Sequence, residues 1–203
     1  MRRGQARESA GDLETRLSRV RSAVAARRSL LMEPQERPPL TAALLDAAAL
    51  FDELRVPFAL AGGLAAMVHG RARFTEDVDL VAVTGHRDVL AAHAEAMTRH
   101  HVDATCTSKL FHDSGVEVDL WKHEHADAII ARARPEQLAG RAVPVVEPTD
   151  LVAMKLRAGR PQDDYDVSEL IRRGRVDEAQ LATRVTPGQL QHYQDLKQRT
   201  PKE

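Results

Sequence analysis

The chain has 203 residues, of which 43% are hydrophobic and 29% are charged. This is the composition of a globular protein, and it excludes disordered, collagenous and coiled-coil chains. The formal charge is −1, so the overall balance indicates neither a nucleic-acid-binding nor a membrane-surface protein. The length allows one medium domain with an appendage or two small domains.

The charge is unevenly distributed along the chain. Residues 1–37 contain nine arginines and five acids, a net charge of +4. The remainder has 20 basic and 25 acidic residues. Any attraction for a polyanion therefore belongs to the amino-terminal arm.

Cysteine usage and hydropathy indicate a protein of the cytoplasm. Cys106 is the only cysteine, so an intrachain disulfide is impossible and a cysteine-based zinc site is disfavoured. The longest apolar stretch, 58–68, has eleven residues including two glycines, whereas a membrane-spanning helix needs roughly 20. The charged start of the chain also disfavours secretion.

The periodicity of apolar residues predicts an α/β fold: a small mixed sheet flanked by helices, an amino-terminal helical arm and a helical carboxyl-terminal tail. We expect three parts, an arm and linker over 1–37, a core over 38–147, and a helical part over 148–203 packed on the core. Expected helices lie at 10–31, 41–54 with Thr41 as the cap, 64–69, 86–100, 125–133, 149–158, 162–173, 177–183 and 187–198. Expected strands lie at 56–61, 77–83, 116–121 and near 141–146, with a β-rich stretch at 102–111.

The clearest chemical feature is the pair Asp77 and Asp79. On a strand, residues two apart point to the same side, so these carboxylates lie together and repel each other. A magnesium ion between them would relieve the repulsion, because Mg²⁺ prefers hard oxygen ligands. An Asp-x-Asp pair is also common on exposed strands, so the pair alone does not establish a metal site.

Asp119 supplies a third carboxylate, because the turn at 113–115 favours a hairpin that lays the strand 116–121 beside the Asp77 strand. Three carboxylates meeting on one sheet face are suited to phosphoryl chemistry with divalent metals. Glu117 has the same alternation as Asp119, so periodicity does not choose between them. If no metal binds there, both are ordinary solvated strand residues.

Two longer segments carry a family resemblance. Residues 61–80 read AGGLAAMVHGRARFTEDVDL, a glycine pair followed by Arg-x-Thr-x-Asp-x-Asp. Residues 148–166 read PTDLVAMKLRAGRPQDDYD, with a lysine, an arginine and spaced aspartates. Together with their surroundings, 56–170, they resemble the nucleotidyltransferases of the DNA polymerase beta-like superfamily, and most closely the bacterial AbiEii type, many of which are toxins of toxin–antitoxin pairs.

The resemblance implies a role for each matching residue. Asp77, Asp79 and Asp119 would bind Mg²⁺ or Mn²⁺, with Asp119 also helping to activate an acceptor hydroxyl. The other implied nucleotide-binding residues are Gly62, Gly63, Arg73, Thr75, Lys155, Asp163 and Asp166, and Lys155 is also an implied catalytic residue.

Each of these residues also has a plain structural interpretation. Gly62 and Gly63 would let backbone N–H groups approach a triphosphate, but they equally suit a strand-to-helix turn without a ligand. The commoner glycine-serine pair is absent, so a serine contact to phosphate is missing. Asp163 and Asp166 share a helical face and can pair with Lys155 or Arg160.

The sequence therefore predicts an enzyme that transfers a nucleoside monophosphate from a nucleoside triphosphate to an acceptor hydroxyl. The resemblance implies an RNA 3′ end, with tRNA as the first expectation, and a cognate antitoxin as a further partner. Small-molecule and protein hydroxyls also stay open as acceptors. Two alternative functions stay open as well: a non-catalytic, antitoxin-like interaction protein of the same fold, and a transferase that modifies an aminoglycoside hydroxyl.

Several remaining residues carry no strong signal of function. His123 and His125 have the spacing of a strand metal pair, but no third ligand is evident, so we interpret them as surface histidines. Trp121 follows the Asp119 strand and is interpreted as a core residue rather than a base-stacking one.

Overall fold

The computed structural model describes residues 38–83, 93–103, 110–121 and 123–201. The expected helix at 10–31, its linker, Cys106, the first half of the expected helix 86–100 and the middle of the stretch 102–111 lie outside these residues. Among the described residues, no helix is both long and apolar enough to cross a membrane.

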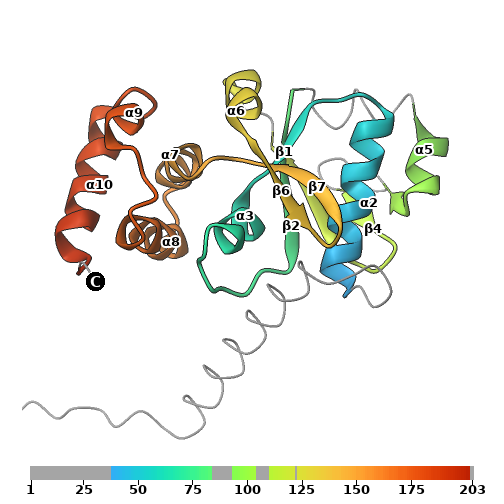
Figure 1. Ribbon diagram of the computed structural model, residues 1–203, viewed down its shortest axis with the longest axis horizontal. Coiled ribbons are helices and arrows are strands. Elements are labelled where there is room, and N and C mark those ends of the chain that lie inside the picture. The colour runs from blue at the N-terminus through green and yellow to red at the C-terminus, as the bar shows by residue number, and fades with distance from the viewer. Residues whose placement is uncertain (1–37, 84–92, 104–109, 122, 202–203) are drawn as a thin grey trace, which may run out of the picture.

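A mixed sheet forms the centre of the described structure (Figure 1). It has seven strands in the order β3-β4-β5-β2-β1-β7-β6. The strands are β1 (Phe58–Leu60), β2 (Asp77–Ala82), β3 (Val102–Asp103), β4 (Leu110–His112), β5 (Glu117–Trp121), β6 (Arg134–Leu138) and β7 (Arg141–Val145). The pairs β2·β5 and β1·β7 are parallel, and the other neighbours are antiparallel. The predicted α/β class is confirmed.

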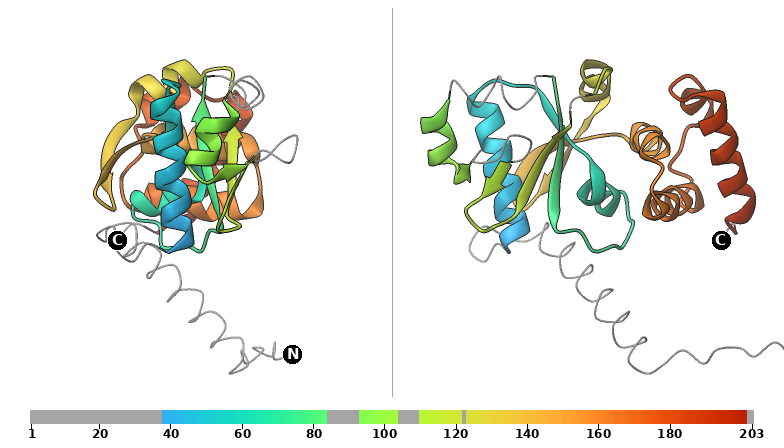
Figure 2. Two further views of the ribbon diagram at one scale, coloured as in Figure 1. Left: turned by 90° about the vertical axis from the view of Figure 1, so that its right-hand side faces the viewer. Right: turned by 180° about the vertical axis from the view of Figure 1, so that it is seen from behind.

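Helices lie on both sides of this sheet, α2 and α5 on one side and α3 on the other (Figures 1 and 2). The described helices are α2 (Pro39–Glu53), α3 (Gly62–Val68), α5 (Ala94–Arg99), α6 (Ala126–Arg132), α7 (Pro148–Ala158), α8 (Pro161–Arg172), α9 (Glu178–Ala182) and α10 (Pro187–Arg199). Beyond α3, helices α7 and α8 form a second layer, and α9 and α10 lie outermost.

The core forms where apolar faces meet the sheet. Helix α2 buries Leu44, Leu50 and Phe51, and the Phe51 ring packs at 5.5 Å, centroid to centroid, against Phe58 of β1. The pattern of apolar residues three and four apart predicted this face. Its cap was predicted wrongly: Pro38 is the N-cap, with Pro39 at the first helical position, and Thr41 is a buried residue inside the helix. Proline suits that first position because its missing N–H has no helical partner there.

A sharp connection joins α7 to α8. Gly159 ends α7 in the left-handed conformation, with φ of 65°, and its N–H donates to the carbonyl of Lys155 at 2.9 Å. Glycine adopts this conformation without steric cost, which is why helices commonly end on it. Pro161 then starts α8 after one residue. This tight connection places the end of α7 beside the first turns of α8.

Candidate active site

The parallel pairing of β2 with β5 brings four acidic residues together. Asp77 pairs with Glu117, and Asp79 pairs with Asp119. Paired residues of neighbouring strands point to the same face of a sheet, and so do residues two apart. Asp77, Asp79, Glu117 and Asp119 therefore occupy one face, so the expected meeting of carboxylates from the two strands is present.

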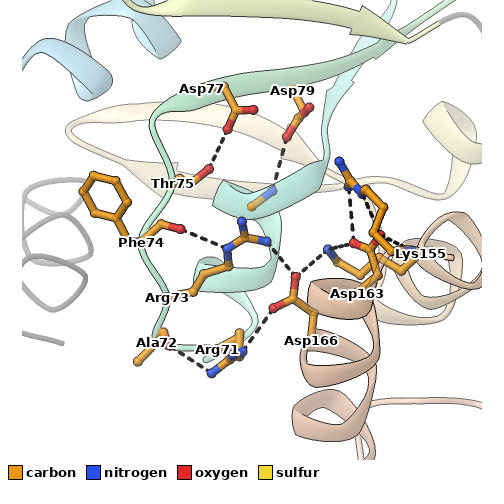
Figure 3. Close-up of polar contacts among 12 residues, drawn as sticks. Arg71, Ala72, Arg73, Phe74, Thr75, Asp77, Asp79, Lys155, Asp163 and Asp166 are labelled. Carbon is orange, nitrogen blue, oxygen red and sulfur yellow. Dashed lines mark hydrogen bonds and ion pairs between the residues drawn. The ribbon is translucent and has the colours of Figure 1, made fainter. Parts of the chain in front are cut away.

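Two hydrogen bonds orient the carboxylates of β2 (Figure 3). The Thr75 hydroxyl donates to Oδ1 of Asp77 at 2.6 Å. The backbone N–H of Gly63 donates to Oδ2 of Asp79 at 3.3 Å. Charge-assisted hydrogen bonds of this kind hold a carboxylate in a defined rotamer. Thr75 and Gly63, both expected to contact nucleotide, thus contact the acids of β2 directly.

The glycine pair lets α3 begin against these acids. Gly62 has φ of 58°, and a Cβ there would lie 1.6 Å from Oδ2 of Asp79. A Cβ on Gly63 would lie 2.4 Å from the Thr75 hydroxyl oxygen. Both distances are shorter than atoms can approach without displacement. The two glycines are therefore required by the close approach of α3 to Asp79 and Thr75.

Asp79 is electrostatically strained. Its burial raises its pKa, and the neighbouring charges of Asp77 and then Asp119 raise it further. The hydrogen bond from the Gly63 N–H and the charge of Lys155 oppose these effects, and the pKa of Asp79 is raised to about 6. A carboxylate that is buried among other carboxylates pays for ionisation, and a cation at the site would remove that cost.

A second cluster joins α7 to α8 through buried charges. Lys155 Nζ donates to Oδ2 of Asp166 at 2.6 Å and to Oδ1 of Asp163 at 3.2 Å. All three residues are buried, with exposed fractions of 4% for Lys155 and 1% for each aspartate. Lys155, Asp163 and Asp166 therefore bind one another in the structure. The sequence analysis gave this pairing as the structural alternative to nucleotide binding.

Three arginines surround the two aspartates of this cluster. Asp166 accepts from Arg73 at 2.7 Å and from Arg71 at 3.1 Å, which ties the segment before β2 to α8. Asp163 accepts from Nε of Arg160 at 2.8 Å. Burial raises the pKa of Asp163, but hydrogen bonds and charges from Arg160 and Lys155 outweigh burial and hold it below its usual range.

The two clusters adjoin each other. Lys155 lowers the pKa of Asp79, and Asp79 and Asp77 are among the charges that raise the pKa of Arg160, behind its hydrogen bond to Asp163. The cluster around Asp163 and Asp166 contains four cations and two anions. The acids of β2 and β5 thus lie beside a cluster with surplus positive charge. This arrangement suits an anionic substrate whose charged end also binds a metal ion.

The carboxylates do not yet form a closed metal shell. Within the described parts of the chain, no three His, Cys, Asp or Glu side chains converge closely enough to enclose an ion. The acids of β2 and β5 are instead neighbours on one face of the sheet. His123 and His125, whose ring centroids are 5.8 Å apart, lie away from this face and line a cavity of about 410 Å³ together with Arg132, Arg157 and Arg184.

The sequence analysis missed some residues of the site. Arg71 was not singled out, although it shares Asp166 with Arg73. Its spacing of two residues from Arg73 in an extended segment was the available signal. Phe74 and Phe111, which line a groove beside Asp77, were also not identified. Trp121 is partly buried against the core, as interpreted.

Comparison with known proteins shows which family part of the chain resembles. Residues 43–119 match the family model described as "Nucleotidyl transferase AbiEii toxin, Type IV TA system". The match ends at Asp119, so it includes the acids of β2 and β5 but not Lys155. No curated protein sequence gives a significant match to the chain.

Three solved structures illustrate what the chain is similar to. An antigenic nucleotidyltransferase-like protein from Paracoccidioides brasiliensis is 21% identical, with 65% of this chain and 74% of that chain covered and a TM-score of 0.46. The antibiotic-resistance factor ANT(2'')-Ia is 18% identical, with 77% and 81% covered and a TM-score of 0.42. The Thermotoga maritima CCA-adding enzyme in complex with tRNA is 12% identical, with 87% and 50% covered and a TM-score of 0.31.

The match covers 77 of the 203 residues. This part of the chain, which carries the paired acids of β2 and β5, is similar to nucleotidyltransferases of the AbiEii type.

Proposed function

We propose that this chain transfers a nucleoside monophosphate from a nucleoside triphosphate to an acceptor hydroxyl in a metal-dependent reaction. The observation that carries the proposal is the register of β2 and β5, which sets Asp79 beside Asp119 with Asp77 on the same face. The raised pKa of Asp79 supports it, because the crowded carboxylates favour a bound cation.

The residues present suit a hard divalent cation. Asp77, Asp79 and Asp119 would hold it, and each offers the carboxylate oxygens that Mg²⁺ and Mn²⁺ prefer. When bound, the ion would neutralise charge on the transferring phosphoryl group and orient its oxygens. Thr75 and Gly63 would keep Asp77 and Asp79 in place before the ion arrives.

The chain's other residues would position the substrate. Asp119 would accept the proton of the acceptor hydroxyl, the role that the family resemblance implies. Arg160, whose side chain is half exposed, and Arg73 would attract the triphosphate. Lys155, Asp163 and Asp166 are buried against one another, so we assign them as positioning residues that hold these arginines beside the acids.

The biological role that we propose is that of a toxin acting in the cytoplasm on an RNA 3′ end, with tRNA as the expected acceptor. The family match supports it, because that family is described as the toxin of a type IV toxin–antitoxin system. A cognate antitoxin protein would then be a further partner.

Label transfer tests the chemistry. The full chain is incubated with each alpha-labelled nucleoside triphosphate, Mg²⁺ or Mn²⁺, and total cellular RNA. We expect label in RNA with wild type and Asp195→Ala, an acid of α10 outside the site, and none with Asp77→Ala/Asp79→Ala. Equal labelling by that double variant would overturn the assignment of the acids.

Expression in bacteria tests the role. A toxin should arrest growth with wild type but not with the double variant. Normal growth with an active, soluble wild-type protein would refute the toxin assignment while leaving the chemistry intact.

A further inference from the structure

The cavity of about 410 Å³ beside His123 and His125 lies between α6, α7 and the end of α9. Figure 1 shows α7 between the other two helices. Basic side chains reach the cavity from each of these elements: Arg132 of α6, Arg157 of α7 and Arg184, which follows α9. The described residues of its lining include neither the acids of β2 and β5 nor Lys155. The cavity is therefore separate from the site that we assign to nucleotidyl transfer.

One buried carboxylate holds two of these arginines. Asp150 of α7 is 2% exposed, and it accepts from Nε and Nη2 of Arg132 at 2.8 and 2.9 Å. It also accepts from Nη1 of Arg184 at 3.0 Å. A bidentate pair fixes the plane of a guanidinium, and a guanidinium carries more N–H donors than one carboxylate can accept. The two cations are thus in place at the cavity before a ligand binds.

Arg157 is the most exposed of the three cations. Its side chain is 48% exposed and donates from Nη1 at 2.7 Å to Glu124, whose side chain is 60% exposed. An ion pair that is this accessible to water contributes little to stability. Arg157 can therefore exchange Glu124 for an incoming anion at small cost to the fold.

The electric field in the cavity is positive, although acids pair with its arginines. Burial lowers the pKa of His123, and the charges of Arg157 and His125 lower it further. The charges of Glu124 and Asp150 act in the opposite direction and are the weaker effects. A positive field inside a partly enclosed space attracts anions.

The number and placement of the guanidinium groups select the kind of anion. A phosphate monoester carries about two negative charges and three acceptor oxygens at neutral pH, and guanidinium groups bind such oxygens through their paired N–H groups. A carboxylate or an internal phosphodiester carries a single charge. The volume lies within the range of small-ligand sites, about 300–1,000 Å³, and Ile129 and Met154 add apolar walls. The cavity therefore suits a phosphate with an organic group attached.

We propose that this cavity binds a terminal phosphate monoester, with Arg132, Arg157 and Arg184 as its charge partners. A small sugar phosphate and the 5′ end of a nucleic acid both carry this group, and the test distinguishes the two sources. The proposal does not rest on the proposed function, because these arginines take no part in the transfer that we assign to β2 and β5.

Isothermal titration calorimetry of the full chain with a chelator present measures binding. The probes are ribose 5-phosphate, with ribose as its control, and one short RNA with and without a 5′-phosphate. We expect a phosphorylated probe to bind and its unphosphorylated counterpart to bind much more weakly. The ring-proton NMR signals of His123 and His125 should shift as the phosphorylated probe binds, which places the ligand in the cavity.

Two variants break the same exposed ion pair but should change binding in opposite directions. Arg157→Gln should weaken binding of the phosphorylated probe about tenfold, because it removes a charged donor. Glu124→Gln should strengthen binding about threefold, because it removes the acid that competes for Arg157. A purely structural role of the pair would affect both variants alike. Arg99→Gln, which breaks an exposed pair with Glu53 of α2, should match wild type.

The outcomes decide the proposal independently of label transfer. Selective binding of ribose 5-phosphate would identify a small metabolite as the source, and selective binding of the phosphorylated RNA would identify a nucleic-acid end. Failure of both phosphorylated probes to bind would overturn the proposal. Binding that leaves the histidine signals in place, or that Arg157→Gln does not weaken, would assign the phosphate to arginines elsewhere and overturn it as well.

Discussion

At the residue scale, Asp79 shows a conflict between folding and the metal-binding role that we propose for it. It is 7% exposed and lies among other carboxylates, so its pKa rises from 3.8 to about 6. A raised carboxylate pKa means that the folded protein binds a proton more tightly than the unfolded chain does. Its contribution to stability is full below the unfolded pKa and is lost as pH rises through 6.

Asp79→Asn should therefore stabilise the metal-free protein at neutral pH. The shift of Asp79 corresponds to about 3 kcal/mol, and the amide retains an oxygen that can accept from Gly63. Urea unfolding in the presence of a chelator should show a gain of up to this size at neutral pH and little difference at about pH 4. Nucleotidyl transfer should be lost in the same variant. A variant that unfolds more easily than wild type at neutral pH would show that ionised Asp79 does not destabilise the fold.

At Gly62, the addition of a single methyl group should lower activity while the fold is kept. Gly62→Ala would place a Cβ 1.6 Å from the Asp79 carboxylate at φ of 58°, so Asp79 must move. We expect transfer to fall about 100-fold or more, since displacement of a reacting group by about 1 Å has this effect. Gly140→Ala is the matched control, because its φ is 83° but nothing lies within 4 Å of the added Cβ. Steady-state kinetics of the two variants, checked by circular dichroism, measure the difference, and equal activities would refute the role of the close approach.

At the element scale, α8 is attached to the segment before β2 by one carboxylate. Asp166 accepts from Lys155, Arg71 and Arg73, and its side chain is 2% exposed. Removing one member of a buried ionic cluster leaves the charges of its partners buried without an opposite charge. The same change at an exposed position of the helix has no such consequence.

Asp166→Ala should destabilise the fold by about 3 kcal/mol or more. Asp164→Ala, next to it on α8, removes a pair with His192 in which both side chains are about 40% exposed and should cost less than about 1 kcal/mol. Chemical denaturation of both variants tests this contrast. Losses of similar size would mean that the Lys155 cluster contributes no more than a surface ion pair.

The same elements show what a sequence can and cannot predict. Helices and strands with a clear period, such as α2, β2 and α8, lie within two residues of their predicted bounds. Strand β6 was missed because four of its five residues are exposed and Pro135 interrupts it, so it has no alternating pattern at the sheet edge. The meeting of Asp77, Asp79 and Asp119 on one sheet face was anticipated from the turn and the family resemblance, whereas the register that pairs Asp79 with Asp119 was not. The contacts of Asp166 with Arg71 and Arg73 span more than 90 positions, and no local pattern encodes them.

At the scale of the whole molecule, the site is assembled from two parts of the chain. The acids come from β2 and β5, while the cationic cluster comes from α7, α8 and the segment before β2. A separate ion pair ties α7 to α6, because Asp150 of α7 accepts from Arg132 of α6 at 2.8 Å. A ligand that contacts both the acids and the arginines would therefore stabilise the sheet and the helical part as one unit.

This arrangement predicts that nucleotide and metal stabilise the protein only together. A nucleoside triphosphate with Mg²⁺ at about 100 times its Kd adds roughly 2.7 kcal/mol, and Tm should rise by about 5–10 °C for a chain of this length. Nucleotide with chelator should have a much smaller effect, because the acids repel the phosphates when no ion lies between them. The variant Asp77→Asn/Asp79→Asn should lose the metal-dependent part of the rise, while Tyr165→Ala should retain all of it. Differential scanning calorimetry measures each case. An equal rise with and without Mg²⁺ in wild type would show that the nucleotide binds through the arginines alone, and that the acids of β2 and β5 take no part in holding it.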